Sequence, residues 1–344
     1  MTFKNIYICK PGCTLQPKEG KTNLQIREME AMQTAMRDAG INAELTTIPW
    51  LSEHATELAN CAIICFNSAK CFDDDLGLLI KICSVVENID LTLISNDCRL
   101  NFKLDTDKYG KFTDRLMRNF VAGECNIRIL TNASNLLDEY IAEIIDWPHY
   151  ELLPIAFSAL YTLPAFMPGQ CVADKTVSVV FACMHFKDYS EKRQNELIDL
   201  KYTFGDNMVL TGDMSGMEVA GEAIESIVTD TNVVWQWYKN AKTTPVLLEP
   251  NYDKYGVMPN RVAEAISCRC MPVLLTANIE NYANMADMSL PIVQSDVEQL
   301  AIVLNQYVTQ YAEQSVQQHL NNLQTILGMY KTQFVVQLQN LYKL

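Results

Sequence analysis

Arg261 and Glu264 have the types and spacing of residues that could do chemistry. Because they are three residues apart, they share one face of a helix whose start is signalled by Pro259 and Asn260. A helix N-terminus carries partial positive charge, and an arginine there favours a bound phosphate. The Glu264 carboxylate can accept two hydrogen bonds from a diol such as ribose. On spacing alone, an exposed ion pair worth a few tenths of a kcal/mol is the simpler interpretation.

Three more charged residues could act with that pair. Asp97 lies at the carboxyl end of a predicted strand, where a carboxylate could take a proton from an acceptor hydroxyl. Lys187 and Arg193 lie in a polar loop after another predicted strand. An inverting group transfer requires one carboxylate base and cations on the departing diphosphate. The alternative roles for Asp97 are a strand-end cap and an ion pair with Arg99.

A basic stretch follows Asp97. Between Asp97 and Arg128 the sequence carries seven basic and five acidic residues, a local balance of +2, with aromatic residues interleaved. The basic residues are Arg99, Lys103, Lys108, Lys111, Arg115, Arg118 and Arg128. The stretch is either a solvated helix and loop or a local patch for a polyanion.

Alternating hydrophobic strands and amphipathic helices must position these residues. In the first half we expect strands at 4–9, 42–47, 60–66, 91–94 and 126–130, with helices at 23–39, 76–87 and 136–145. In the second half we expect strands at 176–183, 245–248, 271–276 and 290–293. Helices are expected from about 194 to 200 and at 231–242, 259–267, 297–311, 315–327 and 328–344. Residues 204–216 are expected to be irregular and 249–258 to form a polar loop. The alternation predicts parallel, doubly wound sheets.

A proline-rich connection at 147–174 separates the two halves. We therefore predict an N-terminal Rossmann-like domain over 1–165, completed by the last helix 328–344, and a C-terminal one over 166–327. Neither a Gly-x-Gly-x-x-Gly motif nor a phosphate-binding P-loop is present, which disfavours a dehydrogenase or a P-loop enzyme. The pattern favours an α/β protein of the B-type glycosyltransferase fold (GT-B), with two Rossmann-like domains facing a central cleft. The acceptor is expected in the first domain and the donor nucleotide in the second.

Composition narrows the class of protein. The chain of 344 residues is 49% hydrophobic and 20% charged, enough for two ordinary cores, and we expect no membrane span and no signal peptide. A cytoplasmic monomer is the resulting expectation. The twelve cysteines lack zinc-like spacing and are expected to be reduced core residues, so no metal site is predicted from them. A net charge of −14 argues against a general nucleic-acid coat.

Several motifs resemble, in order along nearly the whole chain, the T-even phage DNA β-glucosyltransferase family. Asn67 and Ser68, followed by Phe72, resemble that family's strand-end Asn-Ser and loop phenylalanine. Residues 93–102 (LISNDCRLNF) resemble the stretch that carries its aspartate. Residues 179–181 and the following loop resemble its phosphate-loop region. Arg261-Val-Ala-Glu264 and Ser267 match its Arg-Val-Trp-Glu and following serine.

The resemblance implies an inverting transfer of a sugar, glucose above all, from UDP-glucose to 5-hydroxymethylcytosine in duplex phage DNA. Asp97 would be the general base, and Glu264 would bind the ribose. Lys187, Arg193 and Arg261 would hold the diphosphate. Glu28 matches the placement of a family active-site glutamate and would support the active site. Glu249 could also support it, but this suggestion comes from its position directly after a predicted strand and not from the resemblance. The DNA-facing residues would be Phe72, Arg99, Lys103, Lys108, Lys111, Arg115 and Arg118, and the target base would be flipped out of the stack.

Some features leave alternatives open. The family's basic character is absent, its phosphate-loop glycine pair is Ala182-Cys183, and its tryptophan is Ala263, which we expect to leave more room in the pocket. The acceptor could be hydroxymethyluracil, or a small molecule or glycan, and a non-catalytic nucleotide-binding protein is a further alternative. A divalent Mg²⁺ or Mn²⁺ ion on the diphosphate, near Glu249 or Asp253, is an option, although solvated loop carboxylates are the simpler expectation for these two.

Overall fold

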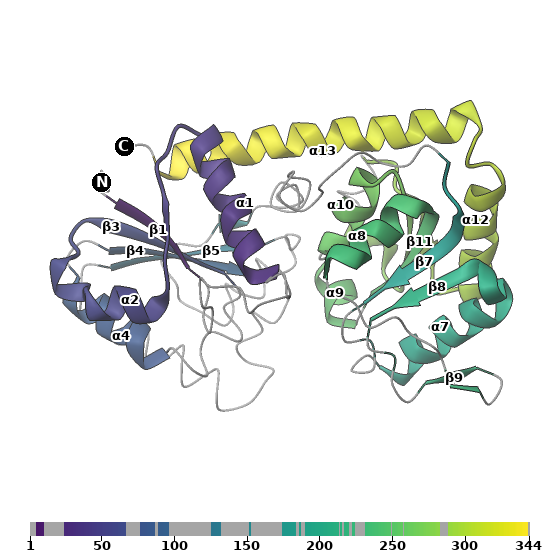
Figure 1. Ribbon diagram of the computed structural model, residues 1–344, viewed down its shortest axis with the longest axis horizontal. Coiled ribbons are helices and arrows are strands. Elements are labelled where there is room, and N and C mark those ends of the chain that lie inside the picture. Colours follow the sequence, from purple (N-terminus) through teal and green to yellow (C-terminus); the bar gives the residue numbers. More distant parts are fainter. Residues whose placement is uncertain are drawn as a thin grey trace. The chain divides into compact units, whose positions relative to one another are not determined.

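The computed structural model describes most of the chain (Figure 1). The residues described are 5–9, 24–66, 76–86, 89–95, 125–131, 151–152, 174–183, 186, 190–212, 214, 217–219, 222–223, 231–248, 250–256, 258–282 and 288–342. The chain divides into two compact units. Unit 1 consists of Met1–Phe166 and Tyr330–Leu344, and unit 2 of Met167–Met329. The assignment of acceptor and donor domains to these units stays a prediction.

Unit 1 contains a parallel sheet with the strand order β2-β1-β3-β4-β5-β6. The strands are β1 (Asn5–Cys9), β2 (Glu44–Leu45), β3 (Cys61–Phe66), β4 (Ile89–Ser95), β5 (Cys125–Thr131) and β6 (Glu151–Leu152). The first connection goes to one side of β1 and the next to the other side. The strand order therefore reverses between β1 and β3, which is the switch point where open α/β sheets bind ligands.

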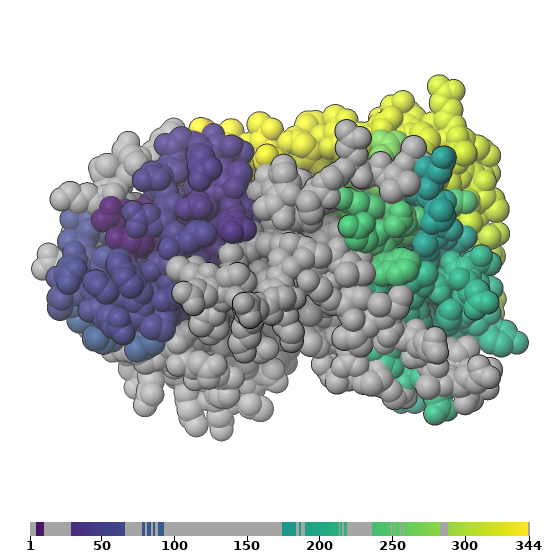
Figure 2. Space-filling view, viewed as in Figure 1, coloured from purple at the N-terminus to yellow at the C-terminus, as the bar shows by residue number. Residues whose placement is uncertain are grey.

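Apart from the last helix of the chain, the helices that the structure describes in unit 1 lie between its strands in the sequence. They are α1 (Leu24–Asp38), α2 (Ile48–Glu53) and α4 (Leu76–Val85), with a 3-10 turn η1 (Ala55–Glu57). Helix α1 lies on the surface of this unit (Figure 2) and buries Met29, Met32 and Met36 against the sheet. It ends at Gly40, whose φ of +78° suits glycine. Helix α2 was not expected, although Thr47 caps it by accepting a hydrogen bond from the Trp50 amide at 3.3 Å.

The last helix, α13 (Gln314–Leu341), is continuous over 28 residues, whereas the sequence predicted two helices meeting at Gly328. One glycine inside an exposed helix lowers its stability by only about 1 kcal/mol relative to alanine. The packing of the helix on either side of Gly328 outweighs that loss. The C-terminal part contacts unit 1, where the Tyr342 hydroxyl lies 2.5 Å from Thr92 Oγ1 and Gln339 Nε2 donates to Ala39 O at 3.1 Å. These contacts attach the chain's end to the core of unit 1.

Unit 2 contains a second parallel sheet, with the order β13-β12-β11-β7-β8. Its strands are β7 (Val177–Ala182), β8 (Met208–Thr211), β11 (Ala241–Leu247), β12 (Met271–Thr276) and β13 (Ile292–Gln294), with a small antiparallel pair β9 (Glu218–Val219) and β10 (Glu222–Ala223). The prediction of an α/β chain with parallel sheets is therefore confirmed. In unit 2 the switch point lies between β7 and β11.

Helices cover the sheet of unit 2 (Figure 1). They are α7 (Glu191–Phe204), α8 (Thr231–Asn240), α9 (Pro250–Tyr255), α10 (Asn260–Ser267) and α12 (Val297–Thr309), with 3-10 turns η5 (Gly205–Asn207) and η6 (Ile279–Tyr282). Helices α8 and α10 contact each other and β11, while α12 contacts α7 and the sheet. The core includes Phe181, Leu197, Leu247, Leu275 and Leu300.

Three sequence predictions in unit 2 were wrong. Residues 204–216 were expected to be irregular but contain β8, whose four residues are too few to show a clear strand pattern. Residues 249–258 were expected to be a loop but contain α9, which Pro250 begins. Helix α7 begins at Glu191, so Arg193 lies in its first turn and not in the preceding loop.

Most of the described cysteines are buried, while Cys83 and Cys183 are half-buried. Cys9, Cys61, Cys65, Cys268 and Cys270 are buried, and no described cysteine is in a disulfide. Among the helices that the structure describes, none combines the length and the apolar character needed to cross a bilayer. The burial of these five cysteines agrees with the structural role predicted for them.

Candidate functional site

Several charged residues gather at the switch point of unit 2. Strand β7 is followed directly by Cys183, and β11 is followed by Leu248 and then by α9 and α10. Helix α7, which carries Arg193, follows β7 in the chain. Because the carboxyl ends of parallel strands lie at one edge of the sheet, these segments meet there.

Arg261 lies in the first turn of α10 and is half-buried. Its Nη2 donates toward Cys183 Sγ, 4.0 Å away. The N-cap residue of α10, Pro259, makes no side-chain capping bond, so the partial positive charge of this helix start is not offset by a capping side chain. A guanidinium in that position, beside the end of β7, is suited to an anion.

Glu264 follows one turn later and is also half-buried. It lies in electrostatic reach of Tyr238, a fully buried residue of α8. Burial raises the pKa of Tyr238 well above 10.0, the Glu264 carboxylate raises it further, and Arg261 lowers it. Arg261 and Glu264 are therefore not the fully exposed ion pair that their spacing alone suggests.

Ala263, between them, is fully buried on the packed face of α10 together with Val262 and Ile266. The expectation that this small residue leaves more room in a pocket was wrong, because the side chain is in the core and does not line open space.

Arg193 is engaged inside the protein. Only 4% of the residue is exposed. Its Nε donates to Leu248 O at 2.6 Å and its Nη1 to Glu196 Oε2 at 2.5 Å, while Nη2 lies 4.0 Å from Asp253 Oδ2. A contact between Arg193 and a diphosphate stays a prediction, and such a contact would have to compete with two carboxylates.

Asp253 is a buried residue of α9, not the solvated loop carboxylate expected from the sequence. Its Oδ1 accepts a short hydrogen bond from the Thr276 hydroxyl, and Oδ2 accepts one from the Ala277 amide at 2.6 Å. Both carboxylate oxygens are thus used at the carboxyl end of β12. Among the described residues no cluster of histidine, cysteine, aspartate or glutamate is arranged to hold a metal ion.

The other predicted site residues lie outside the described part of the chain. They are Asp97, Lys187, Glu249, Phe72, Arg99, Lys103, Lys108, Lys111, Arg115 and Arg118. Glu28 lies in α1, but its side chain is outside the description. Within unit 2, Arg261 and Glu264 lie one turn apart in α10 and both are in electrostatic reach of Tyr238, while Arg193 lies at the same edge of the sheet. Their roles in binding a donor stay predictions.

Sequence reasoning missed two members of this group. Glu196 could have been found, because it follows Arg193 at the three-residue spacing of a helical ion pair. Tyr238 carries no such signal. It is one of several aromatic residues at the end of a helix, and only the packing of α8 on α10 shows that it lies beside the charged pair.

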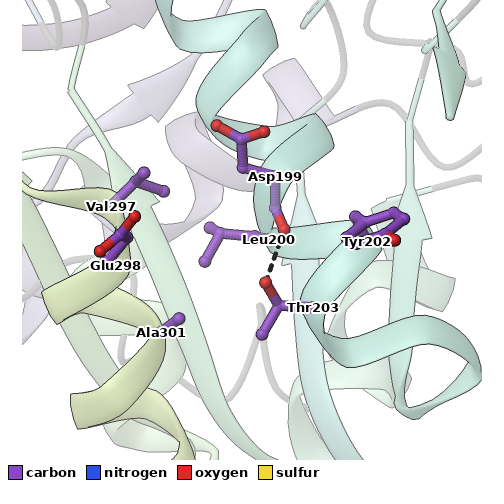
Figure 3. A pocket seen from close by; sticks show the side chains of 7 residues that line it. All are labelled: Asp199, Leu200, Tyr202, Thr203, Val297, Glu298 and Ala301. Atoms are coloured by element: carbon purple, nitrogen blue, oxygen red, sulfur yellow. Dashed lines mark hydrogen bonds between the residues drawn. The ribbon is translucent and has the colours of Figure 1, made fainter. Parts of the chain in front are cut away.

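A cavity of about 280 Å³ lies elsewhere in unit 2, between α7 and α12 (Figure 3). Figure 3 shows its lining side chains, which are Asp199, Leu200, Tyr202, Thr203, Val297, Glu298 and Ala301. None of them is a predicted site residue. The Thr203 hydroxyl donates to the backbone carbonyl of Asp199 at 2.8 Å, so this hydroxyl is used within α7.

No protein-family model matches the sequence, and no curated protein sequence matches it. Solved structures do match. The crystal structure of the DNA-modifying enzyme β-glucosyltransferase, determined with and without its substrate uridine diphosphoglucose, superimposes with a TM-score of 0.66 at 13% identity, covering 98% of each chain. The T4 phage β-glucosyltransferase with UDP-glucose gives 0.65 at 14% identity, and the same phage enzyme with UDP and Mn²⁺ gives 0.62 at 14%, again over 98% of each chain.

At this identity the similarity establishes the fold. Over nearly its whole length, the chain is an α/β protein with parallel sheets whose fold is similar to that of the T4 phage β-glucosyltransferase, a UDP-glucose-binding glycosyltransferase.

Proposed function

We propose that the protein is an inverting glycosyltransferase that moves a sugar, glucose in the first instance, from a UDP-sugar to the hydroxymethyl group of a 5-hydroxymethylpyrimidine in DNA. In this proposal the two units are the acceptor and donor domains of a B-type glycosyltransferase. The observation that carries it is the placement of Arg261 and Glu264 at the switch point of unit 2, in a fold shared with a UDP-glucose-binding enzyme.

The donor would bind to unit 2. Arg261 would contact the diphosphate, where its charge and the amides at the start of α10 stabilise the departing UDP. Glu264 would accept hydrogen bonds from the ribose hydroxyls. Lys187, in the segment between β7 and α7, would supply a second cation to the diphosphate.

The acceptor would be activated by Asp97, which follows β4 in the sequence. The acceptor oxygen attacks the sugar's anomeric carbon as the bond from that carbon to the diphosphate oxygen breaks, and Asp97 takes the hydroxyl proton. Inversion follows from this single displacement. Hydroxymethylcytosine in duplex DNA is the first acceptor to test, with the basic residues from Arg99 to Arg118 facing the phosphates and the target base flipped out of the stack.

A divalent ion is compatible with the donor, since the T4 enzyme has been crystallised with UDP and Mn²⁺. We assign it no protein ligand here. Asp253, the described carboxylate considered for that role, already accepts hydrogen bonds on both oxygens, from Thr276 and Ala277. The cations of Arg261 and Lys187 are instead expected to neutralise the diphosphate.

Mass spectrometry of hydroxymethylated duplex DNA after incubation with a panel of nucleotide sugars tests the proposal. We expect the mass of one hexose per modified base with UDP-glucose, and no transfer by the Asp97→Asn variant, which should still bind UDP. Transfer by that variant at near wild-type rate would exclude Asp97 as the base. No transfer from any donor to DNA would refute the DNA acceptor.

A second acceptor class is favoured by one observation, the net charge of −14, which opposes binding to polyanions. In this alternative the acceptor is a small molecule or glycan. The two candidates differ in how binding responds to salt. A DNA-modifying enzyme should bind duplex DNA with an affinity that falls steeply as salt rises, whereas an enzyme for a neutral small acceptor should show no measurable duplex binding.

A further inference from the structure

The buried charges around Arg193 form a network that reaches Asp253. The three guanidinium nitrogens of Arg193 all approach acceptors: the carbonyl of Leu248, the carboxylate of Glu196 and the carboxylate of Asp253. The side chains of the three charged residues are 5%, 10% and 4% exposed. The network is therefore shielded from water. Its electrostatic interactions are stronger than they would be in solvent, because the interior of a protein screens charges less.

The network joins four segments at one edge of the sheet. Arg193 belongs to the first turn of α7, and Leu248 is the residue after β11. Asp253 belongs to α9, and its oxygens bind Thr276 and Ala277 at the end of β12. A single chain of contacts thus runs from α7 across two strand ends to α9.

Helix α9 is also fixed through its backbone. Asn281 Nδ2 donates to the carbonyls of Asp253 and Lys254 at 2.8 and 3.0 Å. The Tyr282 hydroxyl donates to Tyr252 O at 2.9 Å. Because α10 begins only five residues after α9 ends, the placement of α9 limits where Arg261 and Glu264 can lie.

The charges do not favour Arg193 as a phosphate ligand. Its one positive charge faces two carboxylates, whereas Arg261 lies at the positive end of a helix. Lys192 lies 3.9 Å from Glu196 Oε1, but its side chain is 64% exposed, so its charge is largely solvated. A diphosphate approaching Arg193 would meet the two carboxylates as well.

We infer that Arg193, Glu196 and Asp253 form a positioning network that fixes the start of α10, and that Arg193 does not itself contact the donor diphosphate. The inference rests on the proposed function, since it concerns how the same nucleotide site is held in place. It replaces the direct role that the sequence suggested for Arg193.

The Glu196→Gln variant distinguishes the two possible roles of Arg193, phosphate binding and positioning of α10, because each role predicts an opposite change in the affinity for UDP. If Arg193 bound the diphosphate, removal of a competing negative charge would tighten UDP binding. If Arg193 positions α10, loss of the charged acceptor loosens the network and weakens binding. Asp253→Asn should act in the same direction, because the amide cannot accept hydrogen bonds from both Thr276 and Ala277 on its two terminal atoms.

Titration calorimetry with UDP and with uridine provides the readout. A positioning network sets both the phosphate contact and the ribose contact, so Glu196→Gln and Asp253→Asn should weaken UDP and uridine alike, by roughly tenfold. Arg261→Met should weaken UDP by about 100-fold and leave uridine nearly unchanged, because the cation contacts only the phosphates. Tighter UDP binding by Glu196→Gln, or a loss confined to UDP in both network variants, would overturn the inference.

Lys192→Ala is the matched control, since it removes the exposed partner of the same carboxylate and should change neither the affinity for UDP nor that for uridine.

Hydrogen exchange without ligand gives an independent result. Amides over 250–264 should exchange faster in Glu196→Gln than in Lys192→Ala, and equal exchange would contradict the network. If the wild type binds neither UDP nor uridine, the proposed function fails while the exchange experiment still decides the network. If Asp253→Asn does not fold, Glu196→Gln decides alone.

Discussion

The Arg261 guanidinium lies against the Cys183 thiol, with Nη2 4.0 Å from Sγ, although the two residues are far apart in the sequence. The contact joins the first turn of α10 to the end of β7, on either side of the switch point. Cys183 is half-buried, whereas Cys268 and Cys270 in the same unit are fully buried. The Cys183 thiol can therefore report on what occupies the space beside Arg261.

We predict that UDP protects Cys183 from alkylation by iodoacetamide. A diphosphate bound to Arg261 would cover the adjacent thiol and slow its modification by roughly tenfold or more, because the reagent needs direct access. Peptide mass spectrometry over a time course measures the rate at each cysteine. Cys83 in α4 of unit 1, also half-buried, is the internal control and should react at the same rate with and without UDP. Equal rates at Cys183 under saturating UDP would contradict the predicted position of the diphosphate.

Alkaline pH should destabilise unit 2 through Cys270. Burial raises the pKa of this thiol from 9.0 to about 12, with a smaller opposing effect of Lys175. Between those values the thiol ionises only in the unfolded state. The free energy of unfolding therefore falls as pH rises, by about 1.4 kcal/mol per pH unit, and is unaffected by this group at neutral pH.

Chemical denaturation at several pH values between 8 and about 11 measures this loss. The Cys270→Ala variant should lose stability with a shallower slope over that range. Tyr238→Phe should reduce the loss only above pH 10, since burial and Glu264 raise the pKa of that phenol above 10.0. Identical slopes for Cys270→Ala and the wild type would show that Cys270 does not cause the loss.

The sequence was sufficient to predict the parts of the fold that depend on local patterns. Strand β3 is a continuous apolar run, and β7 and β12 are mostly apolar. The prediction for β12 matches the structure at both ends. Helix α1 has an apolar face and a glycine at its end. In such segments the hydrophobic period and the stop signal agree, so little is left for tertiary contacts to decide.

The prediction failed where tertiary contacts determine the structure. Strand β8 has only four residues, and its pairing with β7 makes it a strand. Helix α9 is a single short segment that Asp253, Asn281 and Tyr282 attach to the rest of unit 2. The role of Arg193 could not be predicted for the same reason, because its second carboxylate partner, Asp253, is distant in the sequence.

Gly328 and Gly205 should respond in opposite directions to substitution by alanine. A Cβ would meet no atom within 4 Å at either glycine, so sterics with neighbours do not separate them. Gly328 lies inside α13, where alanine favours the helix by about 1 kcal/mol. Gly205 ends α7 with φ of 53° and ψ of −130°, a conformation that costs a residue with a side chain roughly 1–3 kcal/mol.

Denaturant unfolding of the two variants beside the wild type measures both effects. We expect the free energy of unfolding to rise for Gly328→Ala and to fall for Gly205→Ala. A loss of stability in Gly328→Ala would indicate that the glycine is needed for the course of α13, and not merely tolerated there.

Lys175, a buried lysine of unit 2, should be sensitive to substitution. The residue is 8% exposed, and its Nζ donates to three carbonyls, those of Tyr238 at 3.0 Å, Lys239 at 2.7 Å and Cys268 at 2.8 Å. The ammonium thereby caps the ends of α8 and α10, and lies 6.0 Å from the centre of the Tyr311 ring. Lys175→Met keeps most of the length of the side chain but removes the ammonium that donates to these buried carbonyls.

We expect Lys175→Met to lower the free energy of unfolding by about 3 kcal/mol, as for other buried polar groups that lose a charged partner. Lys201→Met is the matched control. Lys201 also donates to two carbonyls, Gly205 O at 2.7 Å and Met208 O at 2.9 Å, but it is only half-buried, so water can replace the ammonium at a cost of about 1 kcal/mol or less. Because α10 carries Arg261, the Lys175 variant should also bind UDP more weakly than the Lys201 variant when both are folded. Equal stability of the two variants would show that burial of Lys175 does not make its three hydrogen bonds stronger than those at the surface.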